Sequence, residues 1–241
     1  MSPDTMTATR ARFVDQGFCV LPGVVPLDEV RTLMDGYLSL LRRQTGWELD
    51  DPWKGEIIRR FRAAPAEETR VYDDIRTTPL LRELALRPSI TSKAEEAMGG
   101  PVALLSKIVF RIDLPHTTAE LAYWHQDHFY VKGDFRTITA WVPLQDTPFE
   151  LGCLGVMPGS HRDGLLPHDL VIGKRHLPRA ALGREIRLAA MEAGDLLLFH
   201  SCLVHSSNLN LSDSIRYSVQ ARFVPMGADV DPGMGEAIPV G

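Results

Sequence analysis

The chain of 241 residues is poor in cysteine, and its three cysteines are widely separated. Cys19, Cys153 and Cys202 are an odd number of thiols without paired spacing, which argues against a disulfide framework or a zinc knuckle. No apolar run approaches the ~20 residues that a membrane span needs. The polar N-terminus does not resemble a secretion signal. These absences predict a soluble protein in a reducing compartment, most simply the cytoplasm.

The chain also lacks a surplus of positive charge. It has 26 Lys and Arg residues against 31 Asp and Glu residues, a net charge of −5. The densest basic cluster, residues 174–176 with Arg179, is small and is interpreted as a solvated loop. A nucleic-acid-modifying enzyme would be expected to carry a basic patch. We therefore expect a small-molecule substrate, and neither nucleic acid nor membrane as a partner.

The most informative pattern that is present is a His-x-Asp motif, His125 and Asp127, followed downstream by His205 and Arg216. On a β-strand, residues i and i+2 point the same way, so His125 and Asp127 can reach one ion while Gln126 points elsewhere. His205 lies 78 positions after Asp127 (205 − 127) and must come from another strand. Two imidazoles and one carboxylate on one side of a metal form the facial triad of non-haem Fe(II) oxygenases.

Arg216 follows His205 by 11 positions (216 − 205), enough for a tight connection and a return strand. A guanidinium there can bind the distal carboxylate of a keto acid through two parallel hydrogen bonds. The competing interpretation places Arg216 on a solvent-exposed strand face with Ser218, Gln220 and Arg222. A barrel that encloses a charged co-substrate reverses that expectation, so we favour a role in binding.

The first hundred residues favour helices. Helical spacing of apolar residues, prolines near the start and capping residues predict three helices, at about residues 26–43, 78–85 and 89–98. Thr78 is the expected N-cap of the second helix. Residues 46–69 lack clear periodicity and are interpreted as a loop with a short helix around residues 57–61.

From Pro101 onward the periodicity changes to two, which indicates strands. The strands are expected at about residues 107–114, 137–144, 195–200 and 216–224. Short strands with Gly- and Pro-rich connections indicate an antiparallel jelly roll or barrel. Residues 164–190 are the expected long loop, a type of segment that often forms a lid. With no repeat or second domain, residues 1–241 are predicted to form one domain, mostly helical over about 12–100 and a jelly-roll core over about 101–225.

Four segments resemble the phytanoyl-CoA dioxygenase family. They are Phe13–Val25, Trp124–Asp127, Pro158–Arg162 and the stretch from Gly194 through His205 to Arg216. The resemblance extends from about residue 12 to residue 225. One departure is Glu150-Leu151-Gly152, where the family commonly has Asn between the Glu and the Gly.

The resemblance implies a mainly β protein with flanking helices, a double-stranded β-helix of cupin-like type braced by N-terminal helices. It implies Fe(II) held by His125, Asp127 and His205, with 2-oxoglutarate as co-substrate and dioxygen as oxidant. Arg216 and Ser207 would bind the distal carboxylate of the co-substrate. For Ser207, the alternative of a serine in a turn stays open.

Further candidates surround these residues. Trp141 and Thr139 share one face of their strand and are candidates for contact with the co-substrate, with core packing as the alternative for Trp141. Lys107 could line the pocket from an earlier strand or lie exposed. The residues that flank the metal motif are candidates for the substrate pocket, although core packing would also suit the aromatic ones: Tyr123, Gln126, Phe129 and Tyr130.

Two classes of function remain. The first is an oxygenase that hydroxylates a small metabolite, in natural-product biosynthesis or elsewhere, or that carries out desaturation, epimerisation or cyclisation. Halogenation is disfavoured because Asp127 supplies the carboxylate that a halogenase replaces. The second is a non-oxidative cupin-like isomerase, hydrolase or small-molecule binder. Arg216 favours the first class, since a plain metal-binding cupin needs no carboxylate anchor at that spacing.

Overall fold

Two antiparallel sheets face each other in the computed structural model, which describes residues 7–118, 121–171 and 174–240. Seven strands form the large sheet, in the order β1 (Phe18–Leu21), β9 (Leu196–His200), β4 (Ile138–Pro143), β11 (Arg216–Pro225), β2 (Val102–Leu105) and β12 (Ala237–Pro239), with β3 (Val109–Asp113) also paired with β11. The small sheet has the order β10 (His205–Ser207), β5 (Leu154–Val156) and β8 (Arg187–Ala189).

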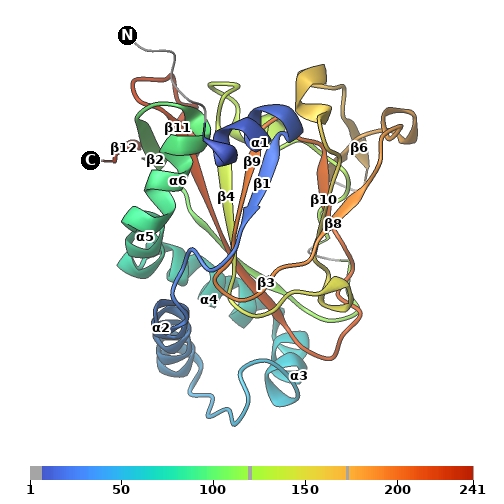
Figure 1. The fold of residues 1–241 in the computed structure, drawn as a ribbon. Coiled ribbons are helices and arrows are strands. Elements are labelled where there is room, and N and C mark those ends of the chain that lie inside the picture. The colour runs from blue at the N-terminus through green and yellow to red at the C-terminus, as the bar shows by residue number, and fades with distance from the viewer. Residues whose placement is uncertain (1–6, 119–120, 172–173, 241) are drawn as a thin grey trace.

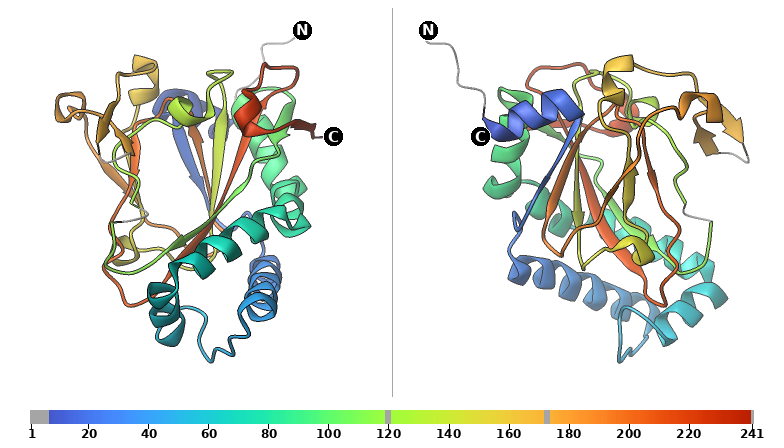
Figure 2. Two further views of the ribbon diagram at one scale, coloured as in Figure 1. Left: turned by 180° about the vertical axis from the view of Figure 1, so that it is seen from behind. Right: turned by 45° about the vertical axis from the view of Figure 1, so that its right-hand side comes forward.

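Helices cover the outer face of the large sheet, opposite the small sheet (Figures 1 and 2). The helices that precede β2 in the chain are α1 (Ala8–Gln16), α2 (Leu27–Thr45), α3 (Glu56–Ala63), α4 (Pro65–Thr77), α5 (Pro79–Ala85) and α6 (Pro88–Met98). A further single turn, α7 (His128–Val131), directly follows Asp127 and is not part of this layer. Short 3₁₀ turns occur at η1 (Phe149–Leu151), η2 (Ser160–Asp163), η3 (Arg179–Ala181) and η4 (Pro232–Met234). Within the described ranges, no helix combines the length and the apolarity needed to cross a membrane.

The alternation of side chains along each strand sorts them into two layers. Phe110 and Tyr217 belong to the main core, which also contains the buried residues of the helices. Trp141, Leu197 and Phe199 point the other way and pack with residues of the small sheet. The large sheet therefore lies between two apolar layers, and its inner face is the one directed toward the small sheet.

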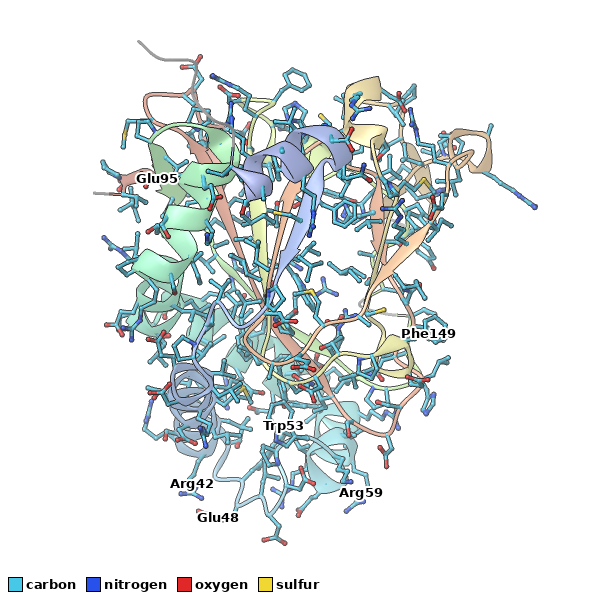
Figure 3. The ribbon with its side chains drawn as sticks, viewed as in Figure 1. Arg42, Glu48, Trp53, Arg59, Glu95 and Phe149 are labelled. Carbon is cyan, nitrogen blue, oxygen red and sulfur yellow. The ribbon has the colours of Figure 1, made fainter. Side chains whose placement is uncertain are left out.

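The helical layer is tied directly to β11. Trp53, labelled in Figure 3, precedes α3 and packs edge-on against the ring of Tyr217, with ring centroids 5.2 Å apart. The carbonyl of Trp53 accepts a hydrogen bond of 2.6 Å from the N–H of Ile215. The start of β11, where Arg216 lies, is thus fixed from both the sheet and the helical side.

The expected jelly-roll class with bracing helices is confirmed, and most predicted elements are present. The expectation of a loop up to residue 69 was wrong, because α4 begins at Pro65 and buries Val71 and Ile75. Thr78 precedes α5, but its hydroxyl donates to the carbonyl of Ile75 instead of capping that helix.

Residues 164–190 are more ordered than expected. They contain a hairpin of β6 (Asp169–Val171) and β7 (Lys174–His176), and β8 joins the small sheet. Residues 172–173 of this segment lie outside the described residues.

A glycine at residue 194 lets the connection before β9 approach the N-terminal segment. Gly194 has a φ of +82°, and its carbonyl accepts a hydrogen bond of 2.8 Å from the N–H of Val25. A Cβ at this position would lie 2.2 Å from the carbonyl oxygen of Val25. We expect Gly194→Ala to lower the free energy of unfolding by about 2–4 kcal/mol, measured by urea denaturation.

Gly183→Ala is the matched control, since a Cβ added there would meet nothing within 4 Å and the φ of Gly183 is not in the left-handed region. It should change the stability by less than about 0.5 kcal/mol. Equal stability of the two variants would contradict the close approach at residue 194.

Candidate metal centre

The two predicted histidine ligands lie side by side, where the turn before α7 meets the small sheet. The N–H of His125 donates to the carbonyl of His205 at 2.9 Å, and the N–H of His205 donates to the carbonyl of His125 at 3.0 Å. Their ring centroids are 4.3 Å apart. Because His205 opens β10, the backbone of the small sheet sets the distance between the two imidazoles.

Asp127 completes a cluster that could hold one ion. Its Oδ1 lies 3.5 Å from Nε2 of His125 and 3.7 Å from Nε2 of His205. The ligand atoms of the three side chains all lie within 4.8 Å of one another. Metal–ligand bonds of about 2.1 Å at right angles would place donor atoms about 3 Å apart. Small side-chain movements would therefore suffice to bind an ion.

The local structure differs from the strand on which the sequence argument relied. His125 lies in an isolated bridge, whereas Asp127 has helical backbone angles (φ −59°, ψ −33°) and immediately precedes α7. A turn, and not the alternation of a regular strand, brings this carboxylate to the imidazoles.

The histidine tautomers suit metal binding. Nδ1 of His125 lies 2.6 Å from the carbonyl oxygen of Tyr123, and Nδ1 of His205 lies 2.9 Å from that of Leu203. A carbonyl oxygen can only accept a hydrogen bond, so each Nδ1 carries a hydrogen, and in the neutral ring Nε2 is the nitrogen with the lone pair. Burial, reinforced by His125, lowers the pKa of His205 to about 4. His205 is thus neutral at pH 7.

The second oxygen of Asp127 is held by the large sheet. Thr139 Oγ1 on β4 donates to Asp127 Oδ2 at 2.6 Å, and Arg222 Nη2 on β11 lies 3.4 Å from the same oxygen. Burial alone would raise the pKa of Asp127, but the positive charge of Arg222 opposes burial, and the pKa lies well below the usual value. The carboxylate is ionised, with Oδ1 directed at the imidazoles.

This donor set fits Fe(II). Two imidazole nitrogens and one carboxylate oxygen with open positions form the facial triad of non-haem iron oxygenases. The open side faces a cavity of about 350 Å³, to which all three residues contribute.

Arg216 lies in this cavity and not on a solvent face. It is 2% exposed and stands opposite Asp113 in the register of β11 and β3. Its Nη2 and Nε lie 2.8 and 3.3 Å from Asp113 Oδ2, and its Nη1 donates to the carbonyl of Gly152. Of five guanidinium N–H bonds, two remain, one on each terminal nitrogen. These two form the fork that a further carboxylate would need.

Gly152 belongs to the loop that departs from the family pattern, just after η1, where Phe149 is labelled in Figure 3. Its φ is +83°, and a Cβ there would lie 2.6 Å from the carbonyl oxygen of Asn208 and 3.2 Å from Arg216 Nη1. The loop retains the glycine that gives its carbonyl access to Arg216.

Asp113 is a charged residue of this site that the sequence argument did not assign. Burial would raise its pKa, but Arg111 and Arg216 outweigh burial and lower the pKa to about 2. The sequence does carry a signal for this residue, because Val109, Arg111 and Asp113 share the face of β3 opposite to its apolar face. That pattern gave no indication that the polar side faces a buried cavity.

The other co-substrate candidates have different positions. Ser207 lines the cavity, where its Oγ accepts a hydrogen bond of 2.8 Å from the N–H of Ala122. Trp141 is buried in the apolar cluster beneath the cavity, and Thr139 contacts Asp127 instead of the cavity. Lys107 is exposed, donates to the carbonyl of Gly233 at 3.1 Å and does not line the cavity, so the structure gives it no place in the pocket.

Of the four substrate-pocket candidates, two line the cavity and two do not. Tyr123 and Tyr130 line the cavity and are 43% and 50% exposed. Phe129 packs against the ring of His168, with centroids 4.8 Å apart. Gln126 is fully buried, and its amide donates to the carbonyls of Gly164 and Cys202. Neither Phe129 nor Gln126 lines the cavity.

Sequence reasoning also missed Tyr72, which lines the cavity from α4. Because that helix was not expected, nothing in the sequence indicated that a residue so far from the motif lies at the site.

The phytanoyl-CoA dioxygenase (PhyH) family model matches residues 13–218. The chain is 30% identical over 237 residues to the 1-deoxypentalenic acid 11-beta-hydroxylase of Streptomyces arenae, covering 89% of this chain and 80% of that protein. It is 24% identical over 235 residues to the peroxisomal phytanoyl-CoA dioxygenase of Homo sapiens, covering 91% of this chain and 69% of that protein.

Solved structures also match this chain. The non-heme alpha ketoglutarate dependent epimerase SnoN from nogalamycin biosynthesis matches with a TM-score of 0.63 and 25% identity, covering 93% of this chain and 84% of that one. The non-heme monooxygenase ThoJ matches with a TM-score of 0.72 over 96% of this chain and 83% of that one. At 18% identity, the likeness to ThoJ concerns the fold alone.

The jelly roll and its cavity, with two histidines, an aspartate and a buried arginine, define the class of non-haem iron oxygenases that use a keto acid. The chain belongs to the phytanoyl-CoA dioxygenase family. It is a 2-oxoglutarate-dependent dioxygenase, whose cofactors are Fe(II) and 2-oxoglutarate. The predictions of family, enzyme class and cofactors are confirmed.

The contact between Thr139 and Asp127 predicts an effect on metal affinity. We expect Thr139→Val to weaken Fe(II) binding by about 10–100-fold, because the carboxylate loses the hydrogen bond that orients it. Thr139→Ser, which keeps the hydroxyl, should bind nearly as wild type. Anaerobic competition against a chromophoric chelator measures the affinity.

Thr137→Val is the control, since the Thr137 hydroxyl donates to the backbone carbonyl of Asp134, away from the carboxylate of Asp127. The orienting role would be refuted if Thr139→Val and Thr137→Val bound iron equally well.

Proposed function

We propose that this enzyme hydroxylates an unactivated carbon of a small-molecule metabolite in natural-product biosynthesis, converting 2-oxoglutarate to succinate and CO₂. The observation that carries the proposal is one cavity that contains both the His125–Asp127–His205 cluster and the fork of Arg216. A non-oxidative cupin would have no use for the buried arginine.

Within this proposal, His125, Asp127 and His205 hold Fe(II). When bound, the iron with its keto acid and dioxygen supplies the oxidation of a C–H bond. Arg216 binds the distal carboxylate of 2-oxoglutarate through the two N–H bonds that Asp113 and Gly152 leave free. Ser207 also lines the cavity. Its hydroxyl contacts the backbone of Ala122 and would turn from it to the same carboxylate when 2-oxoglutarate binds.

We further propose that residues 1–241 act as one catalytic domain. The main core combines residues of the helices with residues of the large sheet. One helix, α4, contributes Tyr72 to the wall of the cavity. The helical layer thus shapes the substrate site as well as bracing the sheet.

The relatives support a small metabolite as substrate. One is named for the hydroxylation of 1-deoxypentalenic acid, and the structural neighbour SnoN is an epimerase of nogalamycin biosynthesis. A cavity of about 350 Å³ is at the small end of ligand sites, which suits a compact substrate beside the co-substrate. Hydroxylation is the outcome we favour; epimerisation uses the same centre and is the second candidate, motivated by SnoN.

Anaerobic titration of the Fe(II)-loaded protein with 2-oxoglutarate tests the proposal. Chelation of iron by the keto acid should give a weak metal-to-ligand charge-transfer band in the visible range. In Arg216→Ala, half-saturation should require at least about tenfold more 2-oxoglutarate, because a bidentate charge-assisted hydrogen bond is lost.

Arg184→Ala serves as control, since Arg184 pairs with Asp163 at the surface. Circular dichroism checks that Arg216→Ala is folded, and Arg216→Lys, which keeps the charge, should show an intermediate affinity. A wild-type protein without the band at saturating iron and co-substrate would favour the non-oxidative cupin alternative.

A further inference from the structure

Three arginines, Arg111, Arg216 and Arg222, line the cavity, and the binding of 2-oxoglutarate gives Arg222 no role. Arg222 follows Arg216 by six positions on β11, so their Cα atoms are separated by about 20 Å along the strand. Arg216 and Arg222 both line the cavity. Arg222 is at the end that contains Asp127, and it is 8% exposed.

The hydrogen bonding of Arg222 is incomplete. Its Nη2 lies 3.1 Å from Gln220 Oε1 and 3.4 Å from Asp127 Oδ2, the second a long contact for a charged pair. Its Nε is buried and has no hydrogen-bond partner. Buried N–H groups without an acceptor are rare in folded proteins, and each costs about 1–3 kcal/mol. Arg222 therefore keeps hydrogen-bonding capacity that the surrounding protein does not use.

Gln220 completes the donor set. It lines the cavity next to Arg222 on the same strand face, and it uses Oε1 to accept from Arg222. The two N–H bonds of its amide remain for an acceptor in the cavity. A guanidinium and an amide that both donate toward one space match the oxygens of a carboxylate.

The charges at the two ends of the cavity differ. At one end, Arg111 and Arg216 carry two positive charges, which Asp113 and the distal carboxylate of 2-oxoglutarate would balance. At the other, Arg222 and Asp127 balance each other before loading. Fe(II) adds two positive charges there, and the other carboxylate of 2-oxoglutarate removes one. Among the described lining residues, this end is left with one positive charge.

We propose that Arg222, assisted by Gln220, is the substrate-anchoring residue, and that the substrate is a monocarboxylate whose carboxylate binds beside the iron centre. The proposal rests on the proposed function, because the unbalanced charge appears only when iron and 2-oxoglutarate are bound.

The test uses the anaerobic protein loaded with Fe(II) and 2-oxoglutarate, which cannot turn over. Cyclohexanecarboxylate and its neutral isostere cyclohexanecarboxamide are titrated by isothermal calorimetry. We expect the carboxylate to bind at least tenfold more tightly than the amide. In Arg222→Met the affinity for the carboxylate should fall to that for the amide, and in Gln220→Leu it should fall less.

Arg222 touches Asp127, so the charge-transfer band is recorded in Arg222→Met to establish that iron and 2-oxoglutarate are still bound. Three results would each overturn the proposal: equal affinities of the two probes, no binding of the carboxylate at millimolar concentration, or discrimination that persists in Arg222→Met. If the charge-transfer band is present in the wild-type protein, these results leave the proposed function intact. Absence of the band in the wild-type protein would instead overturn the proposed function.

Discussion

The carboxylate of Asp127 is the group on which the geometry of the site depends. One oxygen faces the imidazoles of His125 and His205, and the other is held by Thr139 and Arg222. Four separate elements therefore meet at one side chain: the turn before α7, β10 of the small sheet, and β4 and β11 of the large sheet. A carboxylate with one oxygen already engaged offers only the other to a metal, which leaves the remaining positions open for ligands.

The second buried charge pair explains why polar residues can occupy the inner face of the large sheet. Arg216 and Asp113 stand in register on paired strands, so each supplies the counter-charge of the other. Removing one partner of a buried pair commonly costs about 3–5 kcal/mol, because the other charge stays uncompensated. Asp113 thus keeps Arg216 folded into the cavity and fixes the orientation of its guanidinium.

The chemistry of the site could be predicted from sequence, but much of its surroundings could not. His125, Asp127, His205 and Arg216 have residue types and spacings that few other functions require, and these residues converge in the structure. Tyr72 was missed because α4 has only two buried apolar residues to mark its inner face. Lys107 was misplaced because strand alternation predicts which residues share a face, and not which face borders the cavity.

Gln126 shows how the residue between two ligands can serve the site without touching it. Its Oε1 accepts from the N–H of Leu166, and its amide donates to Gly164, while the N–H of Leu177 donates to the carbonyl of Trp124. The segment that carries the β6–β7 hairpin is therefore attached at both ends to residues next to His125. Gln126 thus holds the start of this segment, and Trp124 on the other side of His125 holds its end.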